Sequence, residues 1–74
     1  MDTYHVIPHA QGWALRRSGS DTPLEQADTK AELVGRLAEV LHGRTASVKI
    51  HRADGTIEEE RTYPRSADPR SSEG

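Results

Sequence analysis

The chain has 74 residues, of which 32% are hydrophobic and 30% charged, and its formal net charge is −2 at pH 7. This length allows one small domain, whose core is thin unless the domain associates with a partner. Because the chain has no cysteine, disulfides, zinc–thiolate sites and thiol nucleophiles are all excluded. The small negative charge gives no general attraction to nucleic acid or to an anionic membrane surface.

The N-terminal part predicts two short strands. Tyr4–Ile7 is a β-prone run that ends at Pro8, and Gly12–Arg17 is a second run, with hairpin-loop chemistry in residues 8–12. Because side chains alternate along a strand, each strand should present one face to the core and the other away from it. The expected core-facing residues are Tyr4, Val6, Trp13 and Leu15, and the expected outward-facing residues are His5, Ala14 and Arg16.

A third strand is predicted after a turn cluster at residues 18–21. Pro23–Ala27 is a brief run that would carry Leu24 inward. Because a proline cannot donate to a neighbouring strand, this run suits an edge of the sheet better than its centre.

One amphipathic helix is predicted from Lys30 to about Leu41, with Thr29 before it and Gly43 as a stop signal. Thr29 and Glu32 have the capping-box spacing, in which each side chain bonds the other residue's backbone amide. One stripe of the helix is apolar and its other side is polar, so with no second helix the apolar stripe must lie on a sheet. The stripe consists of Leu33, Val34, Leu37, Val40 and Leu41.

A final hairpin is predicted from Ala46–His51 and residues 56–63, with a two-residue type I′ turn at Asp54-Gly55. Val48 and Ile50 would face inward. The turn would place three pairs on one side of the sheet: Arg52 with Ile57, Ile50 with Glu59, and Val48 with Arg61. Because these pairs mix charged and apolar side chains, either a G1 bulge at Gly55 shifts the alternation or the last strand projects past the helix.

The expected fold is α+β: a small antiparallel sheet of four or five strands with one helix packed on one face, in the order β-β-(β)-α-β-β. Residues 1–63 would form a single domain. Residues 64–74 contain no apolar side chain larger than alanine, so we expect a disordered tail there.

Four stretches resemble a small bacterial family of unknown function. They span roughly residues 4–63, and the resemblance implies no catalytic residue, ligand or partner. The stretches are Tyr4-His5-Val6-x-Pro8, Gly12-Trp13-Ala14, Thr29-Lys30-Ala31-Glu32 and Asp54-Gly55 … Arg61-Thr62-Tyr63.

No metal, cofactor or catalytic site is expected. The four histidines His5, His9, His42 and His51 lack interleaved acidic residues at ligand spacing, so exposed strand and loop positions explain them better. The run of residues 58–60 places its three carboxylates on alternating faces of one strand, so they do not form a catalytic pair. Trp13, the largest apolar side chain, is expected in the core and not as a ligand-stacking platform. An enzyme is therefore not expected.

The leading interpretation is a non-enzymatic interaction module in the cytoplasm that binds a protein partner or a second copy of itself. One helix is too narrow to cover five strands, so part of the apolar face near the last strand should be uncovered. The expected interface is Ile57, Glu59, Arg61 and Tyr63, with Glu59 and Arg61 pairing across a two-fold axis of a homodimer.

The alternative is a nucleic-acid-binding module that uses a basic patch on the open sheet face. Its candidate residues are Arg16, Arg17, Lys49 and Arg52, and His5 and His51 would lie on the same face. Glu58 and Glu60 on the nearby strand, and the absence of an outward aromatic residue, favour a solvated face instead. A steep salt dependence of binding would favour nucleic acid, whereas dimerisation insensitive to salt would favour the interaction module.

Overall fold

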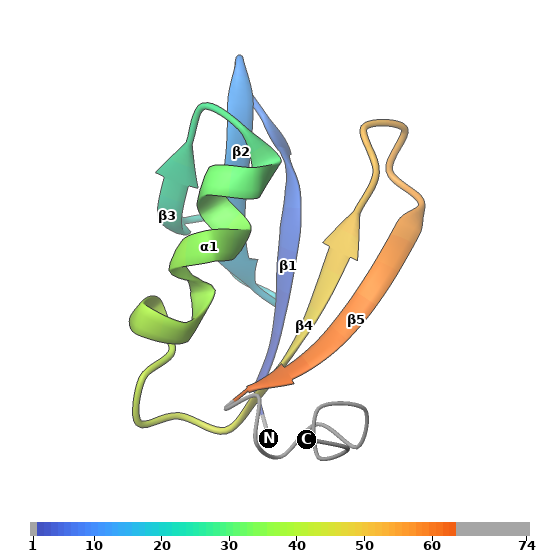
Figure 1. The fold of residues 1–74 in the computed structure, drawn as a ribbon. Coiled ribbons are helices and arrows are strands. Elements are labelled where there is room, and N and C mark those ends of the chain that lie inside the picture. The colour runs from blue at the N-terminus through green and yellow to red at the C-terminus, as the bar shows by residue number, and fades with distance from the viewer. Residues whose placement is uncertain (1, 64–74) are drawn as a thin grey trace.

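The computed structural model describes residues 2–63, which contain five strands and one helix. The strands are β1 (Asp2–His9), β2 (Gly12–Arg17), β3 (Pro23–Ala27), β4 (Ala46–His51) and β5 (Ile57–Tyr63), and the helix α1 (Lys30–Val40) lies between β3 and β4 (Figure 1). The predicted α+β class and element order are confirmed, including the third strand. The expected tail at 64–74 lies outside the described residues.

The five strands form one sheet in the order β3-β2-β1-β4-β5. Neighbouring strands are antiparallel except β1 and β4, which run parallel. The sheet is thus mixed, and not wholly antiparallel as expected. The helix explains the difference, because a helical crossover returns the chain to the end of the sheet where β1 begins. β4 therefore starts beside Asp2 and runs in the same direction as β1.

The core lies between α1 and one face of the sheet. The alternation predicted for β1 and β4 is confirmed, since the inward residues are buried. In β2 Leu15 is buried as expected, but Ala14, expected to face outward, is also fully buried. The buried side chains include Tyr4, Val6, Leu15, Val48 and Ile50 from the sheet and Leu33, Leu37 and Leu41 from α1 and its C-terminal cap. The helix packs mainly on β1, β2 and β3, and Figure 1 shows β4 and β5 diverging from it. Within residues 2–63, no helix has the length and apolar character needed to cross a membrane.

The helix start follows the predicted capping pattern in part. The Thr29 hydroxyl oxygen accepts a hydrogen bond from the Glu32 amide at 3.1 Å. The Glu32 carboxylate, however, accepts from the Thr29 hydroxyl at 3.3 Å and lies 3.7 Å from the Arg36 guanidinium. One of the orphan amides at the helix start is thereby satisfied by a side chain.

Three residues on the expected apolar side lie nearer the surface than the core. Leu24 is 48% exposed, so the prediction that it points inward was wrong, whereas Ile57 is 50% exposed, as an uncovered apolar face near the last strand requires. Leu24 lies in β3 and Ile57 in β5, and both strands have a register shift against their neighbours. An extra residue at such a shift interrupts the alternation of side chains. Trp13 is half-buried and packs against the edge of the core, so the expectation that it belongs to the core holds only in part.

The β1–β2 hairpin is longer than predicted. The first strand was expected to end before Pro8, but β1 continues to His9 and stays paired with β2. Val6 is the last β1 residue paired with β4, and Pro8 lies beyond it. The proline therefore lacks an N–H only where β1 has no pairing with β4 to lose. The turn consists of Ala10 and Gln11, and Ala10 has a φ of 53°.

The β4–β5 turn spans residues 53–55 and is one residue longer than predicted. The Arg52 amide donates to the Thr56 carbonyl at 2.7 Å, the Gly55 amide donates to the Arg52 carbonyl at 2.9 Å, and Gly55 has a φ of 93°. A three-residue turn that ends in a glycine with positive φ is the bulged arrangement that the sequence left open. The expected pairs Ile50–Glu59 and Val48–Arg61 are present, whereas Ile57 is paired with His51 and not with Arg52.

We expect Gly55→Val to lower the free energy of unfolding by about 1–3 kcal/mol, because a β-branched residue is strained at positive φ. Gly55→Asn should cost less, since asparagine tolerates this region best among non-glycine residues. No atom lies within 4 Å of the added Cβ, so a loss would reflect backbone strain and not a clash. Chemical denaturation checks this, and equal stability of the valine and asparagine variants would contradict it.

Candidate functional site

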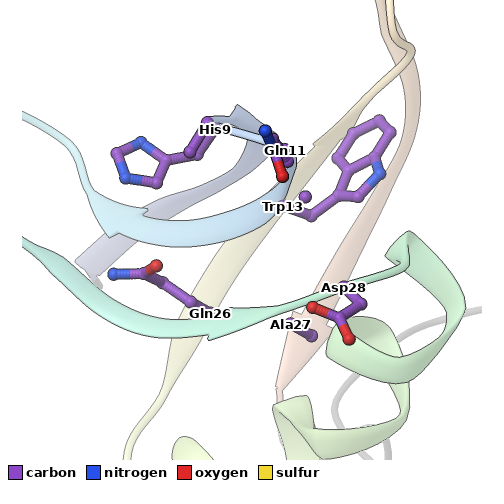
Figure 2. A pocket seen from close by; sticks show the side chains of 8 residues that line it. His9, Gln11, Trp13, Gln26, Ala27 and Asp28 are labelled. Carbon is purple, nitrogen blue, oxygen red and sulfur yellow. The ribbon is translucent and has the colours of Figure 1, made fainter.

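The polar side chains around the larger of two surface hollows do not converge on one point. It has a volume of about 490 Å³ and lies where the β1–β2 turn meets the end of β3 (Figure 2). Figure 2 shows the His9 imidazole and the Gln26 amide on one side of the strands and the Trp13 indole on the other. Ligand pockets need convergent polar groups, so this hollow is a weak candidate. Its lining residues are His9, Ala10, Gln11, Gly12, Trp13, Gln26, Ala27 and Asp28.

Trp13 is covered by the first residue of the helix. The Lys30 ammonium lies 5.2 Å from the centre of the indole ring, which is cation–π distance. The same ammonium donates to the Glu58 carboxylate and to the His51 carbonyl at 3.4 Å. Lys30 therefore connects α1 to β4 and β5 across the indole, and this arrangement favours a structural role for Trp13 over a stacking platform.

The smaller hollow, of about 270 Å³, lies beside the turn that follows β2. Basic side chains from adjacent strands lie together at this hollow. His5 is the register partner of Arg16 on β2 and of Lys49 on β4. These three side chains therefore stand in one row across adjacent strands, on the face opposite α1. The hollow is lined by His5, Ile7, Arg16, Arg17, Ser18, Gly19, Ser20 and His51.

His5 and His51 form a hydrogen-bonded pair that we name the imidazole dyad. Nδ1 of His5 lies 3.0 Å from Nε2 of His51, and Nδ1 of His51 lies 2.8 Å from the Gly55 carbonyl oxygen. A carbonyl only accepts, so His51 must carry a proton on Nδ1. In the neutral dyad His5 then donates from Nδ1 to Nε2 of His51, which leaves Nε2 of His5 as a proton acceptor.

The surroundings of the dyad oppose a positive charge on His5. Partial burial lowers the pKa of His5 below its usual 6.5, and the nearby charges of His51, Lys49 and Arg16 lower it further. Burial is the larger cause of the lowered pKa, and the smaller electrostatic part reflects the cations on this face of the sheet.

The low pKa of His5 predicts a loss of stability in mild acid. His5 binds a proton less readily in the folded than in the unfolded state, so its contribution is present above pH 6.5 and is lost as the pH falls through the folded pKa. The melting temperature should therefore fall as the pH drops below about 6.5. His5→Gln should show a smaller fall in this window, and His9→Gln should behave as the wild type. Identical profiles for the wild type and His5→Gln would contradict the assignment.

The predicted basic patch is not assembled as one surface. Arg16 and Lys49 share the open face. Arg17 is the register partner of the inward-facing Tyr4 and bonds Asp2 at 3.1 Å. Arg52 donates to the Thr56 hydroxyl at 3.3 Å and to the Ile57 carbonyl at 3.1 Å within the β4–β5 turn. Arg52 is thus used elsewhere, and Arg17, which lines the smaller hollow, is already paired with Asp2.

The four predicted interface residues have different environments. Glu59 and Arg61 form an ion pair at 2.7 Å within β5, and their side chains are 34% and 28% exposed. Tyr63 is 3% exposed and belongs to the core, so the expectation that it is uncovered was wrong. Ile57 is exposed, as that expectation required. Glu59 and Arg61 are paired with Ile50 and Val48 and therefore lie on the helix side of the sheet.

Metal binding has little support in this geometry. Within the described range 2–63, no three His, Cys, Asp or Glu side chains lie close enough to hold a metal ion. The dyad itself offers two nitrogens, but Arg16 and Lys49 beside it would repel a cation.

Comparison with known proteins shows the family. A family described as an uncharacterized protein conserved in bacteria, DUF2188, matches residues 4–63. The chain belongs to this family. The resemblance to a small bacterial family of unknown function is thereby confirmed. Searches of curated proteins and of solved structures each found no match to this DUF2188 domain.

The dyad of this DUF2188 domain was missed by sequence reasoning. His5 and His51 are 46 residues apart, and they meet only because β4 lies parallel to β1. The sequence did place His5, His51 and Lys49 on the same outward face, but not the contact between the two imidazoles. The missing information was the strand order, which no local pattern specifies.

Proposed function

We propose that this DUF2188 domain is a non-enzymatic interaction module that pairs with a second copy of itself through the free edge of β5. The observation that carries the proposal is the position of Glu59 and Arg61. They lie on the helix side of the sheet, on a strand at the end of the sheet order, while α1 packs mainly on β1, β2 and β3.

The free edge of β5 is less protected than the opposite edge. The outer edge of an end strand carries unpaired backbone groups that can pair with another strand. At the other end of the sheet, β3 has five residues, a proline and a register shift, which all discourage pairing. β5 has seven residues and no proline. Its register shift lies near its start, between the partners Ile50 and His51.

The charges of β5 fit a two-fold axis at Glu60. In an antiparallel pair of β5 strands centred there, Glu59 of one copy lies opposite Arg61 of the other, and this contact occurs twice. The intrachain ion pair would then become part of a four-charge network. Glu60 would meet Glu60 of the partner on the axis, which costs stability unless one carboxylate is neutralised.

Sedimentation or light scattering over a dilution series tests the proposal. We expect the mean mass to rise from monomer to dimer in the micromolar range, which corresponds to about 8 kcal/mol of association free energy. Glu60→Gln should tighten the dimer by removing the repulsion on the axis. Glu25→Arg, a charge reversal on β3, should leave it unchanged. A monomer mass for both the wild type and Glu60→Gln at every concentration would refute the proposal.

We also infer a non-catalytic role in the cytoplasm. Small domains of oxidising compartments commonly depend on disulfides, whereas this chain has no cysteine. The larger hollow lacks convergent groups. Neither Ser18 nor Ser20, which line the smaller hollow, is hydrogen-bonded to the imidazole dyad, as activation of a hydroxyl nucleophile would require. Conversion of any tested substrate class that is lost in His5→Gln would contradict the non-enzymatic role.

A further inference from the structure

We propose that the open face of the sheet binds one phosphate group of a small phosphate monoester, held by His5 and Arg16 over the smaller hollow with Lys49 beside them. This site lies on the face of the sheet opposite Glu59 and Arg61. Glu60, which would lie on the axis of the proposed dimer, borders the site beyond Lys49.

The first argument is the positive charge that the protein leaves uncompensated. Lys49 has no ion-pair partner within residues 2–63, and Arg16 has one loose partner, Asp21, at 4.0 Å. Both flank His5 in the strand register. Two cations and an imidazole in one row form a site to which an oxyanion is attracted.

The second argument is the supply of hydrogen-bond groups at the hollow. In the neutral dyad, Nε2 of His5 has no bond to any of residues 2–63, and on protonation it becomes a donor. Protonation there preserves the bond from His5 to His51, because Nδ1 of His5 already donates. The turn adds the Gly19 amide and the Ser18 hydroxyl, neither of which is bonded within the described chain.

The third argument limits the ligand to one phosphate group. Asp21 lies beyond Arg16 at one end of the row, and Glu60, the register partner of Lys49, lies at the other end. Glu60 bonds the Ser47 hydroxyl at 2.9 Å and not Lys49. Carboxylates at both ends would repel the neighbouring phosphates of a nucleic-acid chain, so the geometry favours a small monoester over a polymer.

Nuclear magnetic resonance of the histidine side chains tests the site with inorganic phosphate and glycerol 3-phosphate as probes, at constant ionic strength. We expect saturable shifts at His5 and His51 and an increase of about half a unit or more in the pKa of His5, because the bound anion stabilises the imidazolium. Binding should be tighter at pH 6 than at pH 8. The charged groups that face His5 are Arg16 from β2, Lys49 and His51 from β4, and Glu60 beyond Lys49.

Variants make the test specific. Lys49→Gln and Arg16→Gln should each weaken phosphate binding by about three- to tenfold, the effect of one lost charge-assisted hydrogen bond or less. His9→Gln and Arg36→Gln, which change groups away from the row, should leave binding unchanged. Equal shifts with chloride would show ionic screening only and would overturn the proposal. Binding of a single-stranded oligonucleotide more than about tenfold tighter than the monoester would overturn it in favour of nucleic acid.

Discussion

Truncation of Leu37 to alanine should lower the free energy of unfolding by about 3–4 kcal/mol. Leu37 is fully buried between α1 and the sheet, and a leucine-to-alanine change in a core costs the transfer free energy plus the cavity that it leaves. A chain of this size has a total stability of about 4–11 kcal/mol. The variant should therefore be close to unfolding at ambient temperature.

Urea denaturation of the Leu37→Ala variant measures this loss. Glu39→Ala removes an exposed side chain of the same helix and is the matched control, for which we expect a change within about 0.5 kcal/mol. Similar losses in the two variants would show that α1 does not pack as described.

Replacement of Gly12 by alanine should be the second severe change, with a loss of about 2–3 kcal/mol. An alanine Cβ at this position would lie 2.4 Å from the Ala27 carbonyl oxygen and 3.2 Å from the Asp28 Cα. Both contacts are with backbone, which cannot move aside as a side chain can. β2 and the β3–α1 junction would therefore have to separate.

Gly35→Ala is the matched control for Gly12→Ala. Gly35 lies inside α1 with no atom within 4 Å of an added Cβ, so alanine there should raise the free energy of unfolding by up to about 1 kcal/mol. Thermal melts of both variants check the contrast in sign. A Gly12→Ala variant as stable as the wild type would mean that the hairpin does not approach β3 so closely.

Much of the fold follows from local patterns in the sequence. The Thr29 cap and the apolar stripe with Leu33 and Leu37 predicted α1, because capping and helical period depend on residues a few positions apart. Alternation predicted the buried faces of β1 and β4 for the same reason. The positive φ required at Gly55 identified the β4–β5 turn within one residue.

The remaining features depend on contacts between distant residues. The parallel pairing of β1 with β4 decides that His5 meets His51, and strand order cannot be read from alternation. The register shifts that expose Leu24 and Ile57 each arise from one extra residue in a strand. The alternation of polar and apolar residues in the sequence does not reveal where such an extra residue lies. Tyr63 was expected on an uncovered part of the apolar face, but it is buried in the core, which local alternation does not reveal.

Charge reversal in two separate chains tests the proposed β5 pairing most directly. Glu59→Arg gives a chain with two arginines at positions 59 and 61, and Arg61→Glu gives a chain with two glutamates there. Across a two-fold axis at Glu60, each variant would place like charges opposite each other twice, whereas an equimolar mixture would place opposite charges together. We predict that each folded variant alone has a monomer mass at concentrations where the wild type is dimeric, and that the mixture regains the dimer mass. Folded variants whose mixture stays monomeric while the wild type dimerises would contradict pairing through β5.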